Sequence, residues 1–207
     1  ASEIRAGMDA FLFRPELGRF ARMINVTASR SIEVDGALDA SLWGLFYFGA
    51  YPADDPRVVS TQKQVADGLV CRTDVGGVAR YRGDYYHQIA SDLDKVPGNP
   101  WFICTLWQAD YQIAKAQTLE ELETALPVLQ WVANHKLRSG VLAEQVHPYS
   151  GDPLSVSPLT WSHATYVSTV QAYLEKRELL AQRGQAPPFR KLKALDLGDF
   201  GHVHDKT

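Results

Sequence analysis

The sequence has little of what marks several common classes of protein. Only two of its 207 residues are cysteine, Cys71 and Cys104, and they lack the close spacing of a zinc or thiol redox motif. We therefore expect two buried thiols rather than a disulfide framework, and neither a metal nor another cofactor. So few cysteines slightly favour a reducing compartment, the cytoplasm, with secretion left open.

Charge of one sign and long apolar runs are also missing. The net charge is −3, and lysine and arginine do not cluster on any segment. This excludes the basic surface that nucleic-acid binding needs. No apolar run approaches the roughly 20 residues of a membrane span, so we expect no membrane partner either. A composition of 45% hydrophobic and 22% charged residues is instead typical of a folded globular domain.

Helical periodicity dominates what the sequence does contain, and it predicts an all-α fold of about six helices. These helices are expected over about residues 2–12, 37–49, 55–70, 101–116, from 118 onward with a kink at Pro127, and 158–183. Residues 18–34 have the pattern of short extended segments, which predicts a small hairpin. The tail, 184–207, has no clear period and is expected to form an extended or partly disordered arm.

Two kinds of helix are expected. Residues 37–49 and 101–116 are apolar on nearly all sides and should be buried, whereas the helix from 118 has a single apolar stripe. An inner and an outer layer of helices would require this division. Asp39, inside the second helix, is better explained as a cap for neighbouring N–H groups than as a substrate contact.

The stretch from 140 to 166 carries the first candidate for chemistry. Glu144 is a lone carboxylate among small and branched apolar residues, and the proline and glycine residues that follow it disfavour a long helix. We expect Glu144 to lie on a connection, where functional residues are common. Ser157 and Pro158 then have the order of an N-cap and a first helical residue.

The long connection over 78–99 carries the second candidate, Arg80, with Tyr81 and Asp84 close to it in the sequence. An arginine presents a planar fork of donors that suits a polar ligand, and a neighbouring carboxylate can fix the fork in place. A solvated salt bridge is the alternative explanation. Trp101 and Trp161 are candidate aromatic platforms for a bound ligand, although tryptophans in apolar helices also serve as core residues.

Five segments of the chain resemble the glucoamylase family of glycoside hydrolases, family 15. In chain order they are G-A-L-D-A-S-L at 36–42, A-R-Y-R-G-D-Y-Y at 79–86, G-N-P-W-F-I-C-T-L-W at 98–107, A-E-Q-V at 143–146 and P-L-T-W-S-H-A at 158–164. The segments follow the order of the family, and the resemblance extends from about residue 3 to about residue 180, so it is specific.

The resemblance implies an (α/α)6 barrel that hydrolyses α-glucosidic bonds with inversion and releases glucose from α-1,4-glucans. It places the general base at Glu144, and it puts Arg80 and Trp101 where the family holds the sugar. The family's catalytic acid lies upstream of the region where this chain begins. We therefore expect residues 1–183 to be the C-terminal half of the catalytic domain, a half-barrel that pairs with the missing N-terminal half or with another copy.

Other functions remain open. Relatives with this scaffold cleave other α-glucosides, so a trehalase or glucodextranase activity is a near variant. The chain could instead be a catalytically inactive glycan-binding or regulatory module. A helical-repeat scaffold fits poorly, because the sequence shows no repeat of about 34–47 residues.

Overall fold

The structure, a computed structural model, describes residues 1–183, so the arm expected over 184–207 lies outside the described residues. The helical elements are α1 (Ser2–Gly7), the π-helix η1 (Met8–Leu12), the 3-10 helix η2 (Ala40–Trp43), α2 (Gly44–Tyr47), α3 (Pro56–Leu69), α4 (Phe102–Lys115), α5 (Leu119–Glu123), α6 (Leu126–His135) and α7 (Thr160–Arg183). The strands are β1 (Phe13–Arg14), β2 (Arg19–Phe20), β3 (Met23–Val26), β4 (Ile32–Asp35), β5 (Val78–Ala79), β6 (Pro100–Trp101), β7 (Gln145–Val146) and β8 (Pro153–Leu154).

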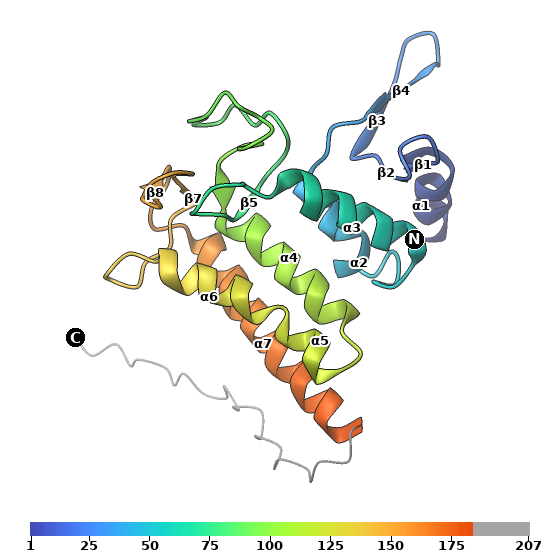
Figure 1. The fold of residues 1–207 in the computed structure, drawn as a ribbon. Coiled ribbons are helices and arrows are strands. Elements are labelled where there is room, and N and C mark those ends of the chain that lie inside the picture. The colour runs from blue at the N-terminus through green and yellow to red at the C-terminus, as the bar shows by residue number, and fades with distance from the viewer. Residues whose placement is uncertain (184–207) are drawn as a thin grey trace, which may run out of the picture.

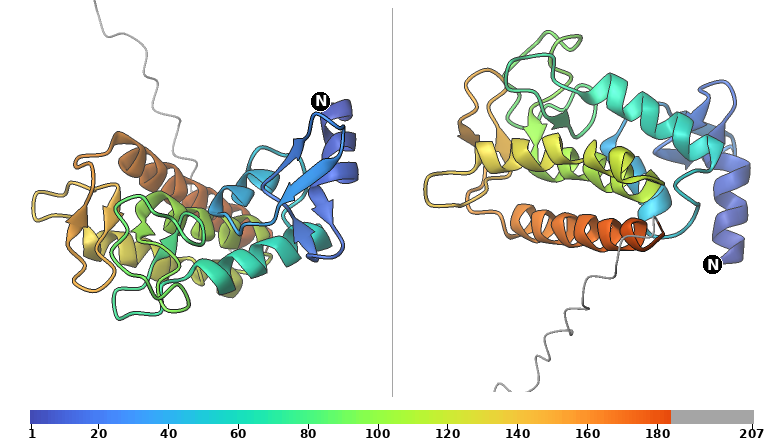
Figure 2. Two further views of the ribbon diagram at one scale, coloured as in Figure 1. Left: turned by 90° about the horizontal axis from the view of Figure 1, so that it is seen from above. Right: turned by 60° about the horizontal axis from the view of Figure 1, so that its bottom comes forward.

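Helix α4 is the centre of the fold. It packs against α7, α6, α5 and η2, and its Phe102 and Leu106 side chains are fully buried. Helices α4 and α7 run side by side in the same direction, while α6 returns antiparallel to them (Figures 1 and 2). The first residues of α4 and α7 therefore lie at the same end of the molecule.

The start signals in the sequence explain where two helices begin. The side chain of Asp55 caps α3, and Pro56 follows as its first residue. Thr118 caps α5 in the same way. The chain then breaks between α5 and α6, and Pro127 is the second residue of α6. These starts and the predicted interruption near Pro127 are confirmed, and α4 matches the helix predicted over 101–116.

The helix predicted over 37–49 is much shorter in the structure. Asp39 is extended and pairs with Tyr81, so helical backbone begins only at Ala40, and Gly49, with a φ of +73°, follows its end. The side chain of Asp39 accepts a hydrogen bond from the Ser41 N–H, which confirms the predicted cap. Complete burial is wrong for this segment, because its last aromatic residues reach the surface.

The last helix begins later than predicted. Helix α7 starts at Thr160, so Ser157 and Pro158 are not its cap and first residue. The reason is a tertiary contact: the Leu159 N–H donates to the Leu142 carbonyl at 3.0 Å, which keeps the preceding residues in a loop beside the segment that leads to β7.

An all-α fold is incomplete as a description, because a four-stranded antiparallel sheet lies where α4 and α7 begin (Figure 1). Its order is β5-β6-β7-β8, and each strand has only two residues. Gly77 permits close packing there: a Cβ at this position would lie 2.7 Å from Pro100 Cβ and 2.6 Å from Trp131 Cζ2. Strands this short leave no period-2 pattern in a sequence, so helical periodicity alone was visible.

The small hairpin predicted over 18–34 is confirmed with shifted boundaries. Strands β3 and β4 pair antiparallel from Met23↔Asp35 to Val26↔Ile32, and the hairpin projects from the helices (Figure 1). Strand β2 pairs with β1 instead. Within residues 1–183, no helix has the length and apolar character to cross a membrane, and the two cysteines are buried free thiols.

Asp110 is a carboxylate buried at the junction of three helical elements. Its Oδ2 accepts a hydrogen bond from Trp43 Nε1 of η2 at 3.1 Å, and its Oδ1 accepts one from the Thr169 hydroxyl of α7 at 2.7 Å. Burial raises the pKa of Asp110 to about 6, although both hydrogen bonds oppose the rise. The carboxylate thus links η2, α4 and α7 at an electrostatic cost.

We expect the contribution of Asp110 to stability to fall as the pH rises through about 4 to 6, because the folded chain holds this proton more tightly than the unfolded chain. With a pKa of 3.8 unfolded and about 6 folded, the loss is on the order of 3 kcal/mol. Asp110→Asn escapes this loss. We expect the free energy of unfolding of this variant, minus that of the wild type, to rise by that amount as the pH increases. Urea titrations at several pH values measure this difference. Asp74→Asn, at an exposed position, is the control, and a pH-independent difference for Asp110→Asn would contradict the prediction.

Candidate active site

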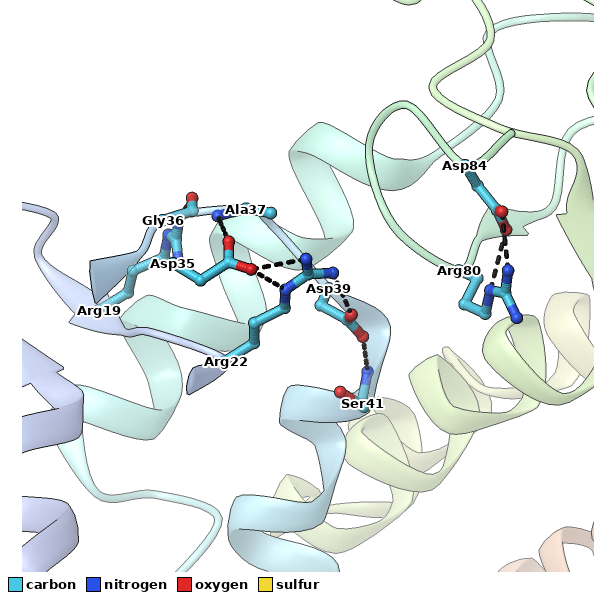
Figure 3. Close-up of polar contacts among 9 residues, drawn as sticks. All are labelled: Arg19, Arg22, Asp35, Gly36, Ala37, Asp39, Ser41, Arg80 and Asp84. Atoms are coloured by element: carbon cyan, nitrogen blue, oxygen red, sulfur yellow. Dashed lines mark hydrogen bonds and ion pairs between the residues drawn. The ribbon is translucent and has the colours of Figure 1, made fainter. Parts of the chain in front are cut away.

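Arg80 and Asp84 form a close ion pair in the connection that follows β5. Nε and Nη2 of Arg80 donate to the two carboxylate oxygens of Asp84 at 2.9 and 2.8 Å (Figure 3). Asp84 is 1% exposed and also accepts a hydrogen bond from the Tyr86 N–H at 3.1 Å. Burial lowers the pKa of Arg80, but the hydrogen bonds and charge of Asp84 outweigh burial and raise it overall. The guanidinium therefore stays cationic and fixed in direction.

Three aromatic rings surround this guanidinium. Its central carbon lies 4.5 Å from the ring centroid of Trp101, 5.0 Å from that of Tyr81 and 5.7 Å from that of Tyr86. Trp101 is buried, whereas the side chain of Arg80 keeps 35% of its surface exposed. A charged donor group that solvent can reach is thus combined with aromatic faces.

Glu144 lies at the bend immediately before β7. Trp101 on β6 is paired in register with Gln145 on β7, and the Phe102 N–H donates to the Glu144 carbonyl at 3.3 Å. The side chain of Glu144 is half-buried. Backbone pairing therefore places the carboxylate residue next to the tryptophan that contacts Arg80, so Arg80, Trp101 and Glu144 lie together at the end where α4 begins.

Ser155 holds the side chain of Glu144, and the sequence analysis missed it. The Ser155 hydroxyl donates to Glu144 Oε2 and lies 3.5 Å from the Tyr86 hydroxyl. The turn between β7 and β8 contains Pro148 and Gly151, which were signals of chain reversal. A reversal at that point would have placed residue 155 opposite Glu144, so this signal could have identified the serine.

Trp161 has a different neighbour. It is the second residue of α7, is 54% exposed, and lies with its ring centroid 6.0 Å from that of Trp107. Trp107 in turn stacks on Trp43 at 4.8 Å. Among the described residues, the ring contacts of Trp161 join it to this second aromatic group and not to the rings around Arg80.

A second ion-pair network holds the Arg80 segment from the other side. Arg22 pairs with Asp35 at 2.6 Å and with Asp39 at 3.2 Å (Figure 3). Asp39 forms a backbone bridge with Tyr81, and the guanidinium of Arg22 lies 5.3 Å from the Tyr81 ring centroid. The projecting hairpin is thus connected to the chain segment that carries Arg80.

The chemistry available here suits a neutral, polyhydroxylated ring. Guanidinium N–H groups donate to hydroxyl oxygens, aromatic faces cover C–H groups, and a half-buried carboxylate can accept a proton. No group of three or more histidine, cysteine, aspartate or glutamate side chains within residues 1–183 could hold a metal ion.

Comparison with known proteins gives a consistent result. The profile of the family described as "Glycosyl hydrolases family 15" matches residues 18–171. An uncharacterized glycosyl hydrolase of Methanocaldococcus jannaschii is 31% identical over 159 residues, which are 72% of this chain and 23% of the relative. A trehalase of Mycobacterium tuberculosis is 30% identical over 161 residues, 74% of this chain and 21% of the relative. A glucoamylase of Clostridium sp. is 29% identical over 150 residues, 69% of this chain and 20% of the relative.

A solved structure of a bacterial glucoamylase in complex with acarbose has the same fold. It superposes with a TM-score of 0.67 at 23% identity, over 89% of this chain and 31% of the glucoamylase. The glucoamylase of Hypocrea jecorina gives a TM-score of 0.55 at 17% identity, over 84% of this chain and 36% of that one. The chain thus spans 20–23% of the length of its curated relatives and about a third of these structures.

The ion pair of Arg80 with Asp84 should contribute more to stability than a surface pair does. Asp84→Asn removes the charge that a half-buried guanidinium faces, and we expect a loss of about 1–3 kcal/mol in the free energy of unfolding by urea titration. Asp94, in the same connection, is 88% exposed and pairs with Arg82. Asp94→Asn should therefore cost less than about 1 kcal/mol. Equal losses for the two variants would show that the burial of Asp84 has no energetic consequence.

Proposed function

The chain belongs to family 15 of the glycosyl hydrolases, and from that membership we propose that it supplies part of the active site of an enzyme that hydrolyses α-glucosidic bonds in glucans with inversion. The observation that carries the proposal is the grouping of Arg80, Trp101 and Glu144 at one end of the fold. A fixed cation and an aromatic face suit the binding of a glucoside, and a carboxylate is one of the two acidic groups that its hydrolysis requires.

Glu144 acts in this proposal as the general base. An inverting glycosidase places two carboxyl groups about 6.5–9.5 Å apart, one to protonate the departing oxygen and one to deprotonate the attacking water. Ser155 donates to Oε2 of Glu144 and thereby fixes the carboxylate in direction. Oε1 is then the oxygen that takes the proton from water as the water attacks the anomeric carbon.

Arg80 and its surrounding rings hold the sugar. The guanidinium donates to glucose hydroxyls, the buried Trp101 ring supports the guanidinium, and the partly exposed Tyr81 ring lies beside it. Asp84 has both oxygens engaged by Arg80 and is almost fully buried, so it acts on the sugar through Arg80. Trp161, more than half exposed, is proposed as a flanking platform for a longer glucan.

The general acid is assigned to a part of the protein other than residues 1–207. The relatives of this chain are several times longer than it is. We propose that residues 1–183 form one half of an (α/α)6 barrel whose other helices carry the acid. The second aromatic group supports this arrangement. Tyr47 and Phe48 are 49% and 78% exposed, and both pack against Trp43. Such a surface is suited to contact with the missing half or with another copy.

Two glucoside types are favoured as substrates. Glucoamylases among the relatives support an α-1,4-glucan, and the trehalases support α,α-trehalose. Both present an α-linked glucose to Arg80 and Glu144, so this part of the site does not distinguish them. A panel of maltose, trehalose and isomaltose, each followed by glucose release, identifies the bond that is cleaved.

Glu144→Gln should abolish most turnover in the complete protein that carries this sequence. The amide keeps the shape of the side chain but cannot accept a proton, so kcat should fall by about 10²–10⁴-fold with little change in KM. Azide, a small nucleophile that needs no deprotonation, should restore part of the rate. Glu123→Gln, on the exposed side of α5, is the matched control. Near-normal turnover of Glu144→Gln would remove Glu144 from the mechanism.

Residues 1–207 purified alone should release no glucose and should self-associate. The acid is missing in this proposal, and Tyr47 and Phe48 leave apolar surface uncovered. Replacing both with serine should reduce association measured by light scattering, whereas Tyr149→Ser, at a 50% exposed position on the turn between β7 and β8, should not. A monomeric chain that releases glucose at an ordinary enzymatic rate would contradict the division of the site between two halves.

A further inference from the structure

Asn99 joins the two parts of the candidate site through a single amide nitrogen. It immediately precedes β6 and is 2% exposed. Its Nδ2 donates to the His87 carbonyl at 2.7 Å and to Gln145 Oε1 at 2.9 Å. His87 lies on the connection that carries Arg80, and Gln145 directly follows Glu144.

We propose that Asn99 is a positioning residue that fixes Glu144 relative to the connection that carries Arg80. The inference rests on the proposed role of Glu144 as the base. Asn99 does not touch the sugar in this proposal. It acts through the residues on either side of the site, and it sets the distance between them.

Two separate routes lead from Asn99 to the Glu144 carboxylate. The first passes through Gln145, whose side chain is fully buried and whose backbone continues from Glu144. The second passes through His87 to its neighbour Tyr86, whose hydroxyl lies 3.5 Å from Ser155 Oγ, and Ser155 donates to Glu144. Loss of the amide would therefore release the carboxylate residue from both directions.

The backbone at His87 indicates that this contact holds the connection in place. His87 has a φ of +55°, a left-handed conformation that a non-glycine residue adopts at a cost. Such a residue persists only where its surroundings determine it. The hydrogen bond from Asn99 to the His87 carbonyl provides that determination, since it is made to the strained residue itself.

The unused atoms of the amide pair argue against a purely stabilising role. Asn99 Oδ1 and Gln145 Nε2 are buried without a hydrogen-bond partner among the described residues. Two buried unpaired polar atoms cost free energy, and this cost offsets part of what the two hydrogen bonds from Asn99 Nδ2 contribute to stability. What the amide pair does supply is a defined geometry between β7 and the connection that carries Arg80.

The test is a double-mutant cycle with Glu144 in the complete protein, using kcat and KM on the glucoside that the wild type cleaves. Asn99→Ala should lower kcat by about 10–100-fold, the usual effect of a displaced catalytic group, with KM changed less than about threefold. In the Glu144→Gln background, Asn99→Ala should change kcat by less than about threefold, because no base remains to be positioned. Asn134→Ala, an exposed asparagine on α6, should leave kcat unchanged in both backgrounds.

Two outcomes would overturn the inference and leave the proposed function standing. In the first, Asn99→Ala lowers kcat by the same factor in the wild type and in Glu144→Gln. In the second, Asn99→Ala has the kcat of the wild type while Glu144→Gln is inactive. Full activity of Glu144→Gln would instead overturn the proposed function. If Asn99→Ala does not fold by circular dichroism, Gln145→Met removes only the contact to β7. It should lower kcat by about tenfold in the wild type and by less than about threefold in Glu144→Gln. Any other pattern for Gln145→Met would count against Asn99.

Discussion

The pairing of β6 with β7 is the contact on which the candidate site depends. It joins Trp101 to Gln145, two residues far apart in the chain, and the Phe102 N–H adds a bond to the Glu144 carbonyl. Each strand has two residues, so the register is held less by the ladder itself than by what flanks it. The burial of Trp101 and the side-chain bond between Asn99 and Gln145 prevent a slip of one residue, which would turn each side chain to the opposite face.

Buried polar groups connect the elements of this fold at a recognisable cost. Asp110 ties η2 and α7 to the central helix, and Asp84 fixes Arg80 beside Trp101. Both carboxylates lose water on folding, and each recovers part of the loss through hydrogen bonds. Apolar packing alone would hold the helices together, but it would not fix the direction of a guanidinium. The buried carboxylates therefore lie where the orientation of a neighbouring side chain or element has to be fixed.

The sequence predicted the elements whose signals are local. Asp55 with Pro56, the Thr118 cap and the Asp39 cap depend on neighbouring residues only, and they appear as expected. Arg80, Trp101 and Glu144 were brought together only by the family resemblance, because no local pattern links segments so distant. Ser155 was missed because its role depends on the return of the chain at β8.

Elements decided by tertiary contacts could not be predicted in the same way. Strands of two residues have no readable period, and their pairing turns an all-α expectation into a fold with a small sheet. The start of α7 was misplaced because the bond from Leu159 to Leu142 overrides the local signal of Ser157 and Pro158. In each case a long-range backbone contact was stronger than local propensity.

The parallel course of α4 and α7 has an electrostatic consequence for Glu144. The first residues of both helices touch the segment that precedes β7: the Phe102 N–H bonds to the Glu144 carbonyl, and the Ser162 hydroxyl bonds to the Ala143 carbonyl. Each helix places the positive end of its peptide dipole there. The positive ends of two peptide dipoles therefore converge on the backbone that leads to Glu144, so the packing that builds the core also sets the electrostatic surroundings of this segment.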